Sequence, residues 1–320
     1  MKNFYVTTPI YYVNDAPHIG HSYTTVLADV LTRFHKIIGC QTFFLTGTDE
    51  HGQKVQRAAA ARGVSPQEHV DEYNLRFRNL WKKMDIQYDY FIRTTDEDHK
   101  NFVRECLQKL FDKGEIYSKE YEGWYSVGEE RFFSEDELDE NKCDPISHRP
   151  VEWLKEKNYF FKMSKYQQQL IDYIQENPDW IVPDFRKNEI LGFLRQPLND
   201  LCISRPKARL SWGIPLPFDE DYVTYVWFDA LINYVSAVRN KTYPDGSKIW
   251  PATYHLIGKD ILTTHSVYWP TMLMALDIPL PKHILAHGWW LVNNDKMSKT
   301  TGNVVNPMEY MEKYGVDAFR

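Results

Sequence analysis

Residues 4–45 are FYVTTPIYYVNDAPHIGHSYTTVLADVLTRFHKIIGCQTFFL, and they combine two kinds of hydrophobic pattern. The β-rich segment from Phe4 to Ile10 and the apolar run from Gln41 to Leu45 are typical of strands. Between them, the turn-forming residues 14–17 precede apolar residues at helical spacing, and Gly39 stands where a helix would end. These apolar residues are Tyr23, Val26, Leu27, Val30, Leu31, Phe34 and Ile38. The segment therefore predicts a strand–helix–strand unit, the building block of a parallel nucleotide-binding sheet.

The α/β pattern continues toward the C-terminus until the texture of the sequence changes. Residues 88–94 predict a strand between two helices, one over residues 70–84 and the other over residues 96–113. From Glu115 to about Pro217, aromatic residues alternate with polar ones and with acidic turns. This texture indicates an inserted β-containing subdomain, with a helical piece near residues 164–177.

Strand and helix patterns resume at Tyr222, and a helix is expected from about Asp260 to Leu276. Asn306 and Pro307 then form a helix start that Gly315 would end, and the sequence stops soon afterwards, so we expect the natural chain to continue. The predicted organisation has four parts: two halves of one sheet domain, an inserted connective subdomain and the start of a helical stem. The sheet domain comprises residues 1–114 and 218–300. The inserted subdomain comprises residues 115–217, and the start of the stem comprises residues 301–320.

Composition narrows the class of protein. The chain has 320 residues and 43% hydrophobic content, enough for a large core divided between two units. Neither a membrane-spanning run nor a signal peptide is evident in the sequence, so a cytoplasmic location is expected. Four scattered cysteines without a C-x-x-C pair favour free thiols over disulfides. A net charge of −6 disfavours a dedicated nucleic-acid binder.

The first chemical motif is Pro17-His18-Ile19-Gly20-His21, between the first predicted strand and helix. A helix N-terminus presents unpaired N–H groups and partial positive charge, which favour phosphate. Two imidazoles one turn apart add donors for phosphate oxygens, and Gly20 leaves space for a flat base. Such donors lower the barrier to transfer at the α-phosphorus. The alternative is two surface histidines that cap a helix, and an isolated motif favours that alternative.

The second motif is Lys296-Met297-Ser298-Lys299-Thr300, followed by Thr301 and Gly302. Two lysines and small hydroxyl residues in a glycine-containing loop suit a clamp on triphosphate, where they offset charge on departing pyrophosphate. Taken alone, a lysine- and serine-containing loop is more often solvated surface.

Together the two motifs are signatures of the class I aminoacyl-tRNA synthetases, and the chain resembles that family over its whole length. Within the family, the finer match is to the methionyl-tRNA synthetases. Five blocks carry this match in order: Thr8-Pro9-Ile10-Tyr11-Tyr12-Val13-Asn14, Gly47-Thr48-Asp49-Glu50-His51-Gly52, Tyr225-Val226-Trp227-Phe228-Asp229-Ala230, Ile257-Gly258-Lys259-Asp260 and His287-Gly288-Trp289.

The resemblance implies a Rossmann-like catalytic domain with an inserted connective subdomain, and it implies ATP and Mg²⁺ as cofactors. His18 and His21 would bind the ATP phosphates, while Lys296 and Lys299 would stabilise the transition state. The implied ATP-binding residues, which hold the adenine, the ribose and the phosphates, are Gly20, Gly258, Asp260, His287, Gly288, Ser298 and Thr300. Trp289 to Leu291 would lie beside the adenine.

The same resemblance implies a methionine pocket. Its candidate residues are Ile10, Tyr12, Asp49, Trp227, Leu231, Tyr234 and His265. Asp49 follows a strand, where ligands of parallel sheets bind, and would pair with the amino group; its alternative role is to cap the helix near Gln53. Trp227, Tyr12 and Tyr234 suit a thioether, because sulfur packs well on aromatic edges. For His265, a satisfied core histidine is the alternative.

Two departures from the family concern metal and the lysine loop. Many relatives hold zinc in the inserted subdomain, but here Ser126 and Glu129 replace the first cysteine pair and leave Cys143 and His148. Because structural zinc needs four Cys or His donors, we expect no structural zinc. Packing by aromatic residues would compensate, with Trp124, Tyr125, Phe132 and Phe133 as candidates. Thr300 replaces the usual serine and keeps its hydroxyl.

The size of the insertion and the set of motifs present bear on several other possible functions. An insertion of about a hundred residues is too small to hold both a zinc knuckle and a hydrolytic editing domain, which argues against the isoleucine, valine and leucine enzymes. The cysteine enzyme is disfavoured because it selects its substrate thiol at a zinc-bound site, and no suitable set of zinc ligands is evident in the sequence. A small-molecule adenylyltransferase and a catalytically silent RNA-binding paralogue remain alternatives. The implied partners are L-methionine, ATP and tRNA(Met), with the anticodon-binding domain beyond Arg320; a membrane partner is not expected.

Overall fold

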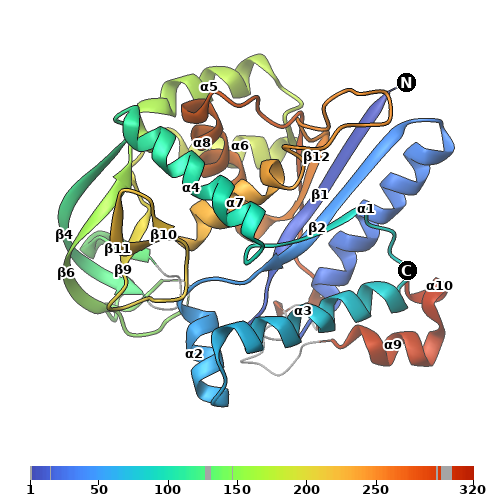
Figure 1. Cartoon of the computed structure of the whole chain (residues 1–320), viewed down its shortest axis with the longest axis horizontal. Coiled ribbons are helices and arrows are strands. Elements are labelled where there is room, and N and C mark those ends of the chain that lie inside the picture. The colour runs from blue at the N-terminus through green and yellow to red at the C-terminus, as the bar shows by residue number, and fades with distance from the viewer. Residues whose placement is uncertain (1, 15, 127–130, 146, 293–294, 297–304) are drawn as a thin grey trace.

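The central element of the computed structural model is a six-stranded parallel sheet with the strand order β3-β2-β1-β12-β13-β7 (Figure 1). The structure describes residues 2–14, 16–126, 131–145, 147–292, 295–296 and 305–320. The strands of the central sheet are β1 (Asn3–Tyr12), β2 (Gln41–Asp49), β3 (Tyr90–Arg93), β7 (Ile181–Val182), β12 (Tyr254–Gly258) and β13 (Ile284–His287). Each neighbouring pair is parallel, which confirms the predicted α/β class.

The predicted strand–helix–strand unit consists of β1, α1 (Ile19–Ile37) and β2. Gly39 follows the helix with a φ of 81°, a conformation that glycine adopts without strain. Pro9 lacks an N–H, and the β1–β2 register shifts between Thr7 and Ile10. Beyond the shift, Tyr12 pairs with Asp49 at the end of both strands.

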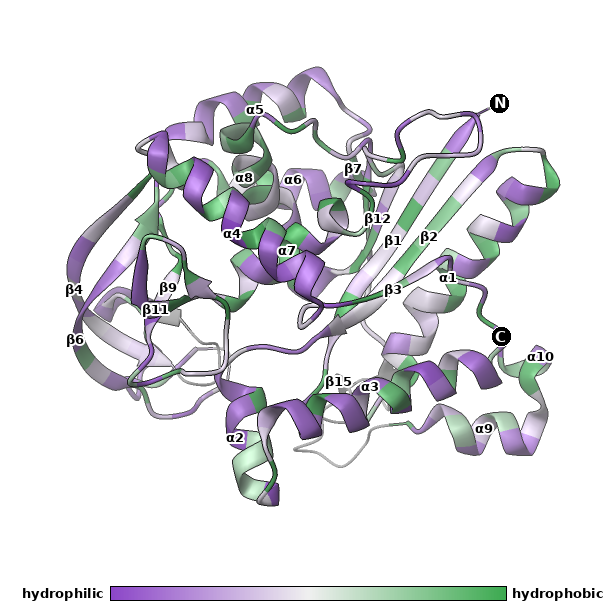
Figure 2. Cartoon of the chain, viewed as in Figure 1, coloured by the Kyte–Doolittle hydropathy of each residue, from purple (hydrophilic) through white to green (hydrophobic). Residues whose placement is uncertain are grey.

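Helices cover both faces of the sheet, and the alternation of strand residues explains the two cores. Phe4 and Val6 of β1 belong to one hydrophobic cluster, which includes residues of α3. Tyr5 faces the opposite way into a second cluster with residues of α4, α7 and α8. These helices are α2 (Gln53–Arg62), α3 (Pro66–Lys83), α4 (Glu97–Asp112), α7 (Val226–Ser236) and α8 (Trp269–Leu276). Along α4, purple and green residues alternate, as expected of a helix with one exposed face (Figure 2).

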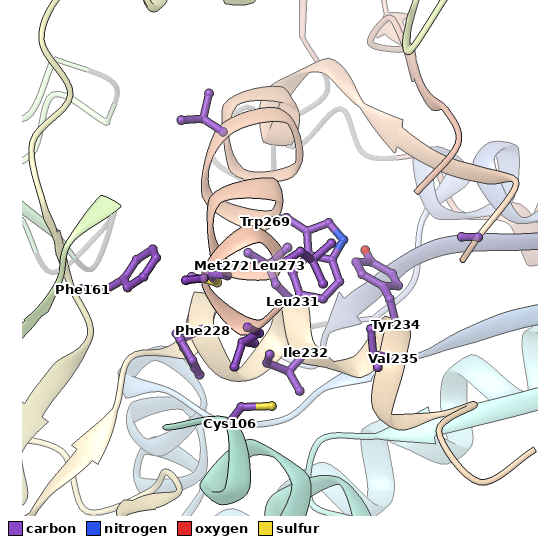
Figure 3. Packing of buried hydrophobic residues seen from close by; sticks show 14 of the residues in the cluster. Cys106, Phe161, Phe228, Leu231, Ile232, Tyr234, Val235, Trp269, Met272 and Leu273 are labelled. Atoms are coloured by element: carbon purple, nitrogen blue, oxygen red, sulfur yellow. The ribbon is translucent and has the colours of Figure 1, made fainter. Parts of the chain in front are cut away.

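The packing of α7 on α8 forms the centre of the second cluster (Figure 3). Leu231 of α7 lies against the α8 side chains, and the rings of Tyr234 and Trp269 have centroids 5.9 Å apart. Trp269 is fully buried, and its indole N–H donates to Nε2 of His255, 3.1 Å away. This packing fixes α7 beside the carboxyl ends of the sheet strands.

The predicted helix over residues 260–276 is present, because all residues from Lys259 to Leu276 are helical, but its turns are not all α-helical. It begins with a 3₁₀ turn, η3 (Lys259–Ile261), passes through a π-helical turn, η4 (Thr264–Tyr268), and ends with α8. Pro270 in the first turn of α8 cannot donate a backbone hydrogen bond to an earlier turn. π-helical turns are frequent at functional sites, and this one carries His265.

The segment predicted as an insertion and the residues directly after it form two small antiparallel sheets. The four-stranded sheet has the order β5-β4-β6-β8, and the three-stranded sheet has the order β10-β11-β9. Their strands are β4 (Ile116–Ser126), β5 (Arg131–Phe133), β6 (Glu152–Phe161), β8 (Leu201–Cys202), β9 (Ser204–Pro206), β10 (Pro215–Leu216) and β11 (Asp219–Thr224). Figure 1 shows β4 and β6 curving at the side of the molecule away from β1 and β2.

Between these strands the chain returns to the central sheet. The 3₁₀ turns η1 (Glu135–Glu137) and η2 (Met163–Tyr166) and the helices α5 (Gln167–Glu176) and α6 (Asp184–Phe193) also lie in the segment. β7, between the two helices, pairs with β13. Residues 115–217 therefore supply the edge strand of the central sheet, the whole four-stranded sheet and two strands of the three-stranded sheet, whose middle strand β11 follows Pro217. The domain boundaries stay a prediction.

The end of the chain packs beside α1. Asn306 caps α9 (Pro307–Tyr314) by accepting a hydrogen bond from the Met308 N–H at 3.0 Å, as the sequence predicts. Gly315, with a φ of 82°, separates this helix from α10 (Val316–Phe319). Arg320 then forms an ion pair with the buried carboxylate of Asp29 in α1. Within the described part of the chain, no helix is long and apolar enough to cross a membrane.

Candidate active site

A cavity of about 460 Å³ lies at the carboxyl ends of the central strands, where β1 and β12 meet. In open parallel sheets, ligands bind where the strand order reverses in this way. Sixteen of the predicted site residues line this single cavity. They are Ile10, Tyr12, His18, Gly20, His21, Asp49, Trp227, Leu231, Tyr234, Gly258, Asp260, His265, His287, Gly288, Trp289 and Trp290. Segments more than 250 residues apart in sequence therefore share one site.

The two histidines of the first motif are held in a defined orientation. His18 caps α1, and its Nδ1 accepts a hydrogen bond from the Gly20 N–H at 3.1 Å. Nδ1 of His21 accepts from the His18 N–H at 3.1 Å, and the two rings stack with centroids 3.8 Å apart. Because both Nδ1 atoms accept backbone hydrogens, the proton of each neutral ring lies on Nε2. The pair can therefore present two Nε2–H donors.

Gly20 is constrained by the neighbouring imidazole. A Cβ at this position would lie 3.0 Å from Cε1 of His18, so any side chain would crowd the ring that caps the helix. The ring of Tyr11 packs against His21 with centroids 4.8 Å apart, and its hydroxyl lies 2.6 Å from Oγ1 of Thr25. The histidine pair is thus supported by the strand before it and by the helix that follows.

Thr24 connects α1 to the last strand of the site. Its hydroxyl lies 2.7 Å from Nε2 of His287, and Nδ1 of that ring lies 2.8 Å from the Gly288 carbonyl oxygen. The carbonyl can only accept, so Nδ1 carries the proton and Nε2 accepts from the threonine. Burial lowers the pKa of His287, which favours this neutral form. Thr24 follows Gly20 by one helical turn, the spacing that could have revealed it.

The end of β12 brings Asp260 to the rim of the cavity. A Cβ on Gly258 would lie 2.5 Å from Oδ1 of Asp260, so this carboxylate occupies the space of a side chain. The indole N–H of Trp289 donates to the same oxygen at 3.3 Å, and Nζ of Lys259 lies 3.7 Å from the centroid of the Trp289 ring. This arrangement leaves a carboxylate beside a bare backbone, which suits a ligand rich in hydroxyl groups.

The apolar end of the cavity has an uncharged polar wall. His265 is 1% exposed, with Nε2 2.7 Å from the Tyr234 hydroxyl and Nδ1 2.9 Å from the Ile261 carbonyl oxygen. The carbonyl requires a proton on Nδ1, so Tyr234 donates to Nε2. Burial lowers the pKa of His265 to about 4, and the ring is neutral near pH 7. The histidine is thus a satisfied core residue that also lines the cavity.

Asp49 ends β2 at the cavity and is 7% exposed. Its alternative role as a helix cap is wrong, because Gly52 is the residue that precedes α2. Lys54, also in the cavity lining, has its Nζ 5.9 Å from the centroid of the Tyr12 ring. Sequence reasoning missed several lining residues, namely Pro9, Tyr11, Thr24, Lys54, Val226, Ala230 and Ile261.

The lysine motif is described in part. Lys296 lies in β15 (Asp295–Lys296), whose backbone pairs with β14 (Leu291–Val292). Ser298, Lys299 and Thr300 lie outside the described residues. On the far side of this gap, the carbonyl of Val305 accepts a hydrogen bond from the Ile19 N–H at 3.2 Å, directly after His18. His287, before the lysine motif, therefore contacts α1 at Thr24, and Val305, after the motif, contacts α1 at Ile19.

Carboxylates organise the loop in which relatives hold zinc. Ser126 donates to Asp144, and Oδ1 of Asp144 accepts from the Ser147 N–H at 3.2 Å. Asp139 accepts from the Cys143 N–H at 2.8 Å and lies 3.1 Å from Nδ1 of His148. Among the described residues, no three His, Cys, Asp or Glu side chains are grouped to hold a metal ion. Glu129 is outside that part of the chain, and the absence of zinc stays a prediction.

Aromatic residues pack the same region. Tyr125 and Phe133 are buried, and the rings of Trp124 and Trp153 make an edge contact with centroids 5.1 Å apart. Arg209 lies over the Tyr125 ring, 4.3 Å from its centroid. The packing expected from Trp124, Tyr125 and Phe133 is therefore present.

Comparison with known proteins gives one family. The family model described as tRNA synthetases class I (M) matches residues 4–148 and 134–320. A methionine–tRNA ligase of Clostridium acetobutylicum is 52% identical over all of this chain, and one of Thermotoga maritima is 49% identical over 99% of it. The matches cover 50% and 51% of those relatives, so the chain spans about half their length.

Solved structures agree with the sequence matches. Mycobacterium tuberculosis methionyl-tRNA synthetase in complex with methionyl-adenylate superposes with a TM-score of 0.92 and 42% identity. The match covers 99% of this chain and 63% of that one. The apo form of the same enzyme gives a TM-score of 0.81. With its parallel sheet, its shared cavity and these matches, the chain belongs to the class I (M) tRNA synthetases.

Proposed function

We propose that this chain is the catalytic region of a methionine–tRNA ligase, which activates L-methionine with ATP to give methionyl-adenylate and pyrophosphate. The names of the relatives and the methionyl-adenylate in a similar solved structure support the substrate assignment. The observation that carries the proposal is the single cavity in which a pair of imidazole donors faces an apolar, aromatic end.

The polar end of the cavity suits ATP. His18 and His21, with their protons on Nε2, donate to phosphate oxygens at the N-terminus of α1, where the helix dipole also favours negative charge. Asp260 beside Gly258 accepts from ribose hydroxyls. The backbone of His287 and Gly288 forms an edge for the adenine. Mg²⁺ bound with ATP would offset the negative charge of the phosphates.

The apolar end suits the methionine side chain. Trp227, Leu231 and Tyr234 of α7 lie in the cavity lining and present aromatic and aliphatic surface to a thioether. Neutral His265 adds no charge that would have to be desolvated when the side chain enters. Asp49, at the end of β2, pairs with the ammonium group of the amino acid. Ile10 and Tyr12 complete this end of the site.

With both substrates bound, the chemical step needs no covalent attachment to the protein. A carboxylate oxygen of methionine attacks the α-phosphorus, the bond from that phosphorus to the bridging oxygen breaks, and pyrophosphate leaves with the electron pair. Fixed donors on the α-phosphate and on the leaving group stabilise the charge that develops. His18 and His21 supply part of this, and Lys296, Lys299, Ser298 and Thr300 of the lysine motif supply the rest.

Transfer to tRNA(Met) is the second reaction. The 3′-terminal hydroxyl of the tRNA attacks the methionyl carbonyl carbon and releases AMP. Recognition of the anticodon would require a part of the protein beyond Arg320, in keeping with relatives that are about twice as long as the matched region. Residues 301–320 would then be the start of the helical stem that leads to this anticodon-binding part.

ATP–pyrophosphate exchange tests the first reaction directly. Each of the twenty amino acids is supplied separately, without tRNA, and the incorporation of labelled pyrophosphate into ATP is measured. Exchange that depends on methionine supports the proposal. Exchange with isoleucine or cysteine alone assigns the chain to a sister enzyme, and the absence of exchange with every amino acid indicates a silent paralogue. An adenylyltransferase would instead exchange with a different acceptor molecule.

A further inference from the structure

A buried carboxylate behind the methionine pocket joins three elements of the fold. Asp229 lies in the first turn of α7 and is 1% exposed. Its Oδ2 lies 2.6 Å from Nδ1 of His51, in the segment between β2 and α2. Its Oδ1 lies 2.7 Å from Nε2 of His99 in α4. We call Asp229, His51 and His99 the rear cluster, and none of them belongs to the described lining of the cavity.

The rear cluster lies on the side of α7 opposite the pocket. Trp227, Leu231 and Tyr234 follow one another at helical spacing and line the cavity. Asp229 and Ser236 lie seven residues apart on another face, and the Ser236 hydroxyl is 2.7 Å from Nδ1 of His99. The ring of His99 therefore bridges the first and last turns of α7.

The cluster also fixes the loop that follows Asp49. His51 is two residues beyond Asp49, and its ring lies against Trp212 with centroids 5.4 Å apart. The indole of Trp212 donates to the carbonyl oxygen of the intervening Glu50 at 2.6 Å. The Glu50 carboxylate in turn accepts from Nε of Arg93 at 2.8 Å. The backbone beside Asp49 is thus held from two directions.

Charge favours this arrangement. Burial alone would raise the pKa of Asp229, but the charges and hydrogen bonds of His51 and His99 outweigh burial and leave the pKa below its ordinary value. A carboxylate that accepts from two imidazoles has two fixed acceptor positions, which set the distance between the β2–α2 segment and α4. Because Asp229 is part of α7, these hydrogen bonds also fix the position of α7.

We propose that Asp229, with His51 and His99, acts as a positioning residue for the methionine pocket by fixing α7 relative to Asp49. This inference rests on the proposed function, because it assigns the pocket between α7 and Asp49 to methionine. The two sides of that pocket come from segments about 180 residues apart, and the rear cluster bridges them with a charged hydrogen-bond network. Misplacement of a binding group by about 1 Å can cost two orders of magnitude in rate or affinity.

The test measures ATP–pyrophosphate exchange in the full-length protein while methionine and ATP are varied separately. Asp229→Ala is expected to raise the methionine KM by about tenfold to a hundredfold, with the ATP KM and the rate at saturating methionine changed by less than about threefold. Asp229→Asn should show a smaller rise, because an amide can pair with both rings once one imidazole changes tautomer.

Two further variants separate positioning from loss of stability. Ser236→Ala removes one hydrogen bond and should raise the methionine KM by about threefold, but it should add nothing to Asp229→Asn. Asp29→Ala is the matched control: that carboxylate is equally buried, is paired with Arg33 and Arg320, and lies outside the described cavity lining. It should lower the thermal midpoint without changing the methionine KM.

The outcomes distinguish the two proposals. A wild-type protein without methionine-dependent exchange overturns the proposed function and this inference with it. If wild-type exchange is normal and both Asp229→Asn and Ser236→Ala keep the wild-type methionine KM, the positioning role alone is overturned. The same holds if Asp29→Ala raises the methionine KM as much as the Asp229 variants do, or if the ATP KM rises in parallel.

Discussion

Replacement of His265 by glutamine tests whether the wall of the methionine pocket is uncharged. The imidazole is buried, with Nε2 2.7 Å from the Tyr234 hydroxyl and Nδ1 2.9 Å from the Ile261 carbonyl oxygen. Its pKa is lowered by burial from the ordinary 6.5 to about 4. Glutamine keeps a donor and an acceptor but cannot titrate in this range.

The sign of the effect follows from proton linkage. Below pH 6.5 the unfolded chain binds a proton at His265 that the folded protein does not bind until about pH 4. Stability from the neutral histidine is therefore fully present above pH 6.5 and is lost as the pH falls toward 4. At about 1.4 kcal/mol per pH unit, the loss is about 2 kcal/mol at pH 5 and about 3 kcal/mol at pH 4.

Urea unfolding at pH 7.5 and pH 5.0 measures this difference. Between these two pH values the wild-type protein should lose about 2 kcal/mol more free energy of unfolding than His265→Gln. The comparison cancels the titration of the histidines that lie away from His265; burial, the larger cause of the lowered pKa of His255, also acts in both proteins. Equal losses in the two proteins would refute the assignment of a neutral His265.

Four other substitutions address the ATP side and the inserted subdomain. His21→Ala and Lys299→Ala should each slow ATP–pyrophosphate exchange by about two to three orders of magnitude in a protein that still folds, and near-normal rates would reject both roles. Gly258→Ala places a Cβ 2.5 Å from Oδ1 of Asp260, so the ATP KM should rise about tenfold while the methionine KM stays constant; a rise in both would argue against a ribose contact. Asp144→Ala should lower the free energy of unfolding by about 1–3 kcal/mol, whereas a strong chelator should leave the wild-type midpoint unchanged; chelator-induced unfolding would reveal a metal.

The central sheet was predictable from local patterns, whereas most of the cavity residues were predicted from the resemblance to the synthetase family. The strand–helix–strand pattern of residues 4–45 corresponds to β1, α1 and β2, and the histidine motif lies at the first turn of α1. Ligands of parallel sheets bind at the carboxyl ends of the strands, which favoured Asp49 as a site residue, and the resemblance added Gly258. Both line the cavity, as do the aromatic candidates.

The structural features that the sequence did not predict depend on contacts with residues far away in the chain. β7 has two residues and carries no recognisable strand pattern, and its place is set by pairing with β13. Asp229 stands in an aromatic block whose spacing says nothing of His51 or His99, which lie far away in sequence. The π-helical turn at residues 264–268 likewise depends on tertiary packing and not on local propensity.

The central claim is that the histidine pair and the lysine motif grip one triphosphate beside a methionine pocket. A crystal structure of the full-length protein with methionine and a non-hydrolysable ATP analogue tests it most directly. We predict Nε2 of His18 and His21 and Nζ of Lys299 within about 3 Å of oxygens of the same triphosphate, with the methionine side chain between Trp227 and Tyr234. An analogue bound away from the histidines, or a Lys299 directed away from the triphosphate, would contradict the account.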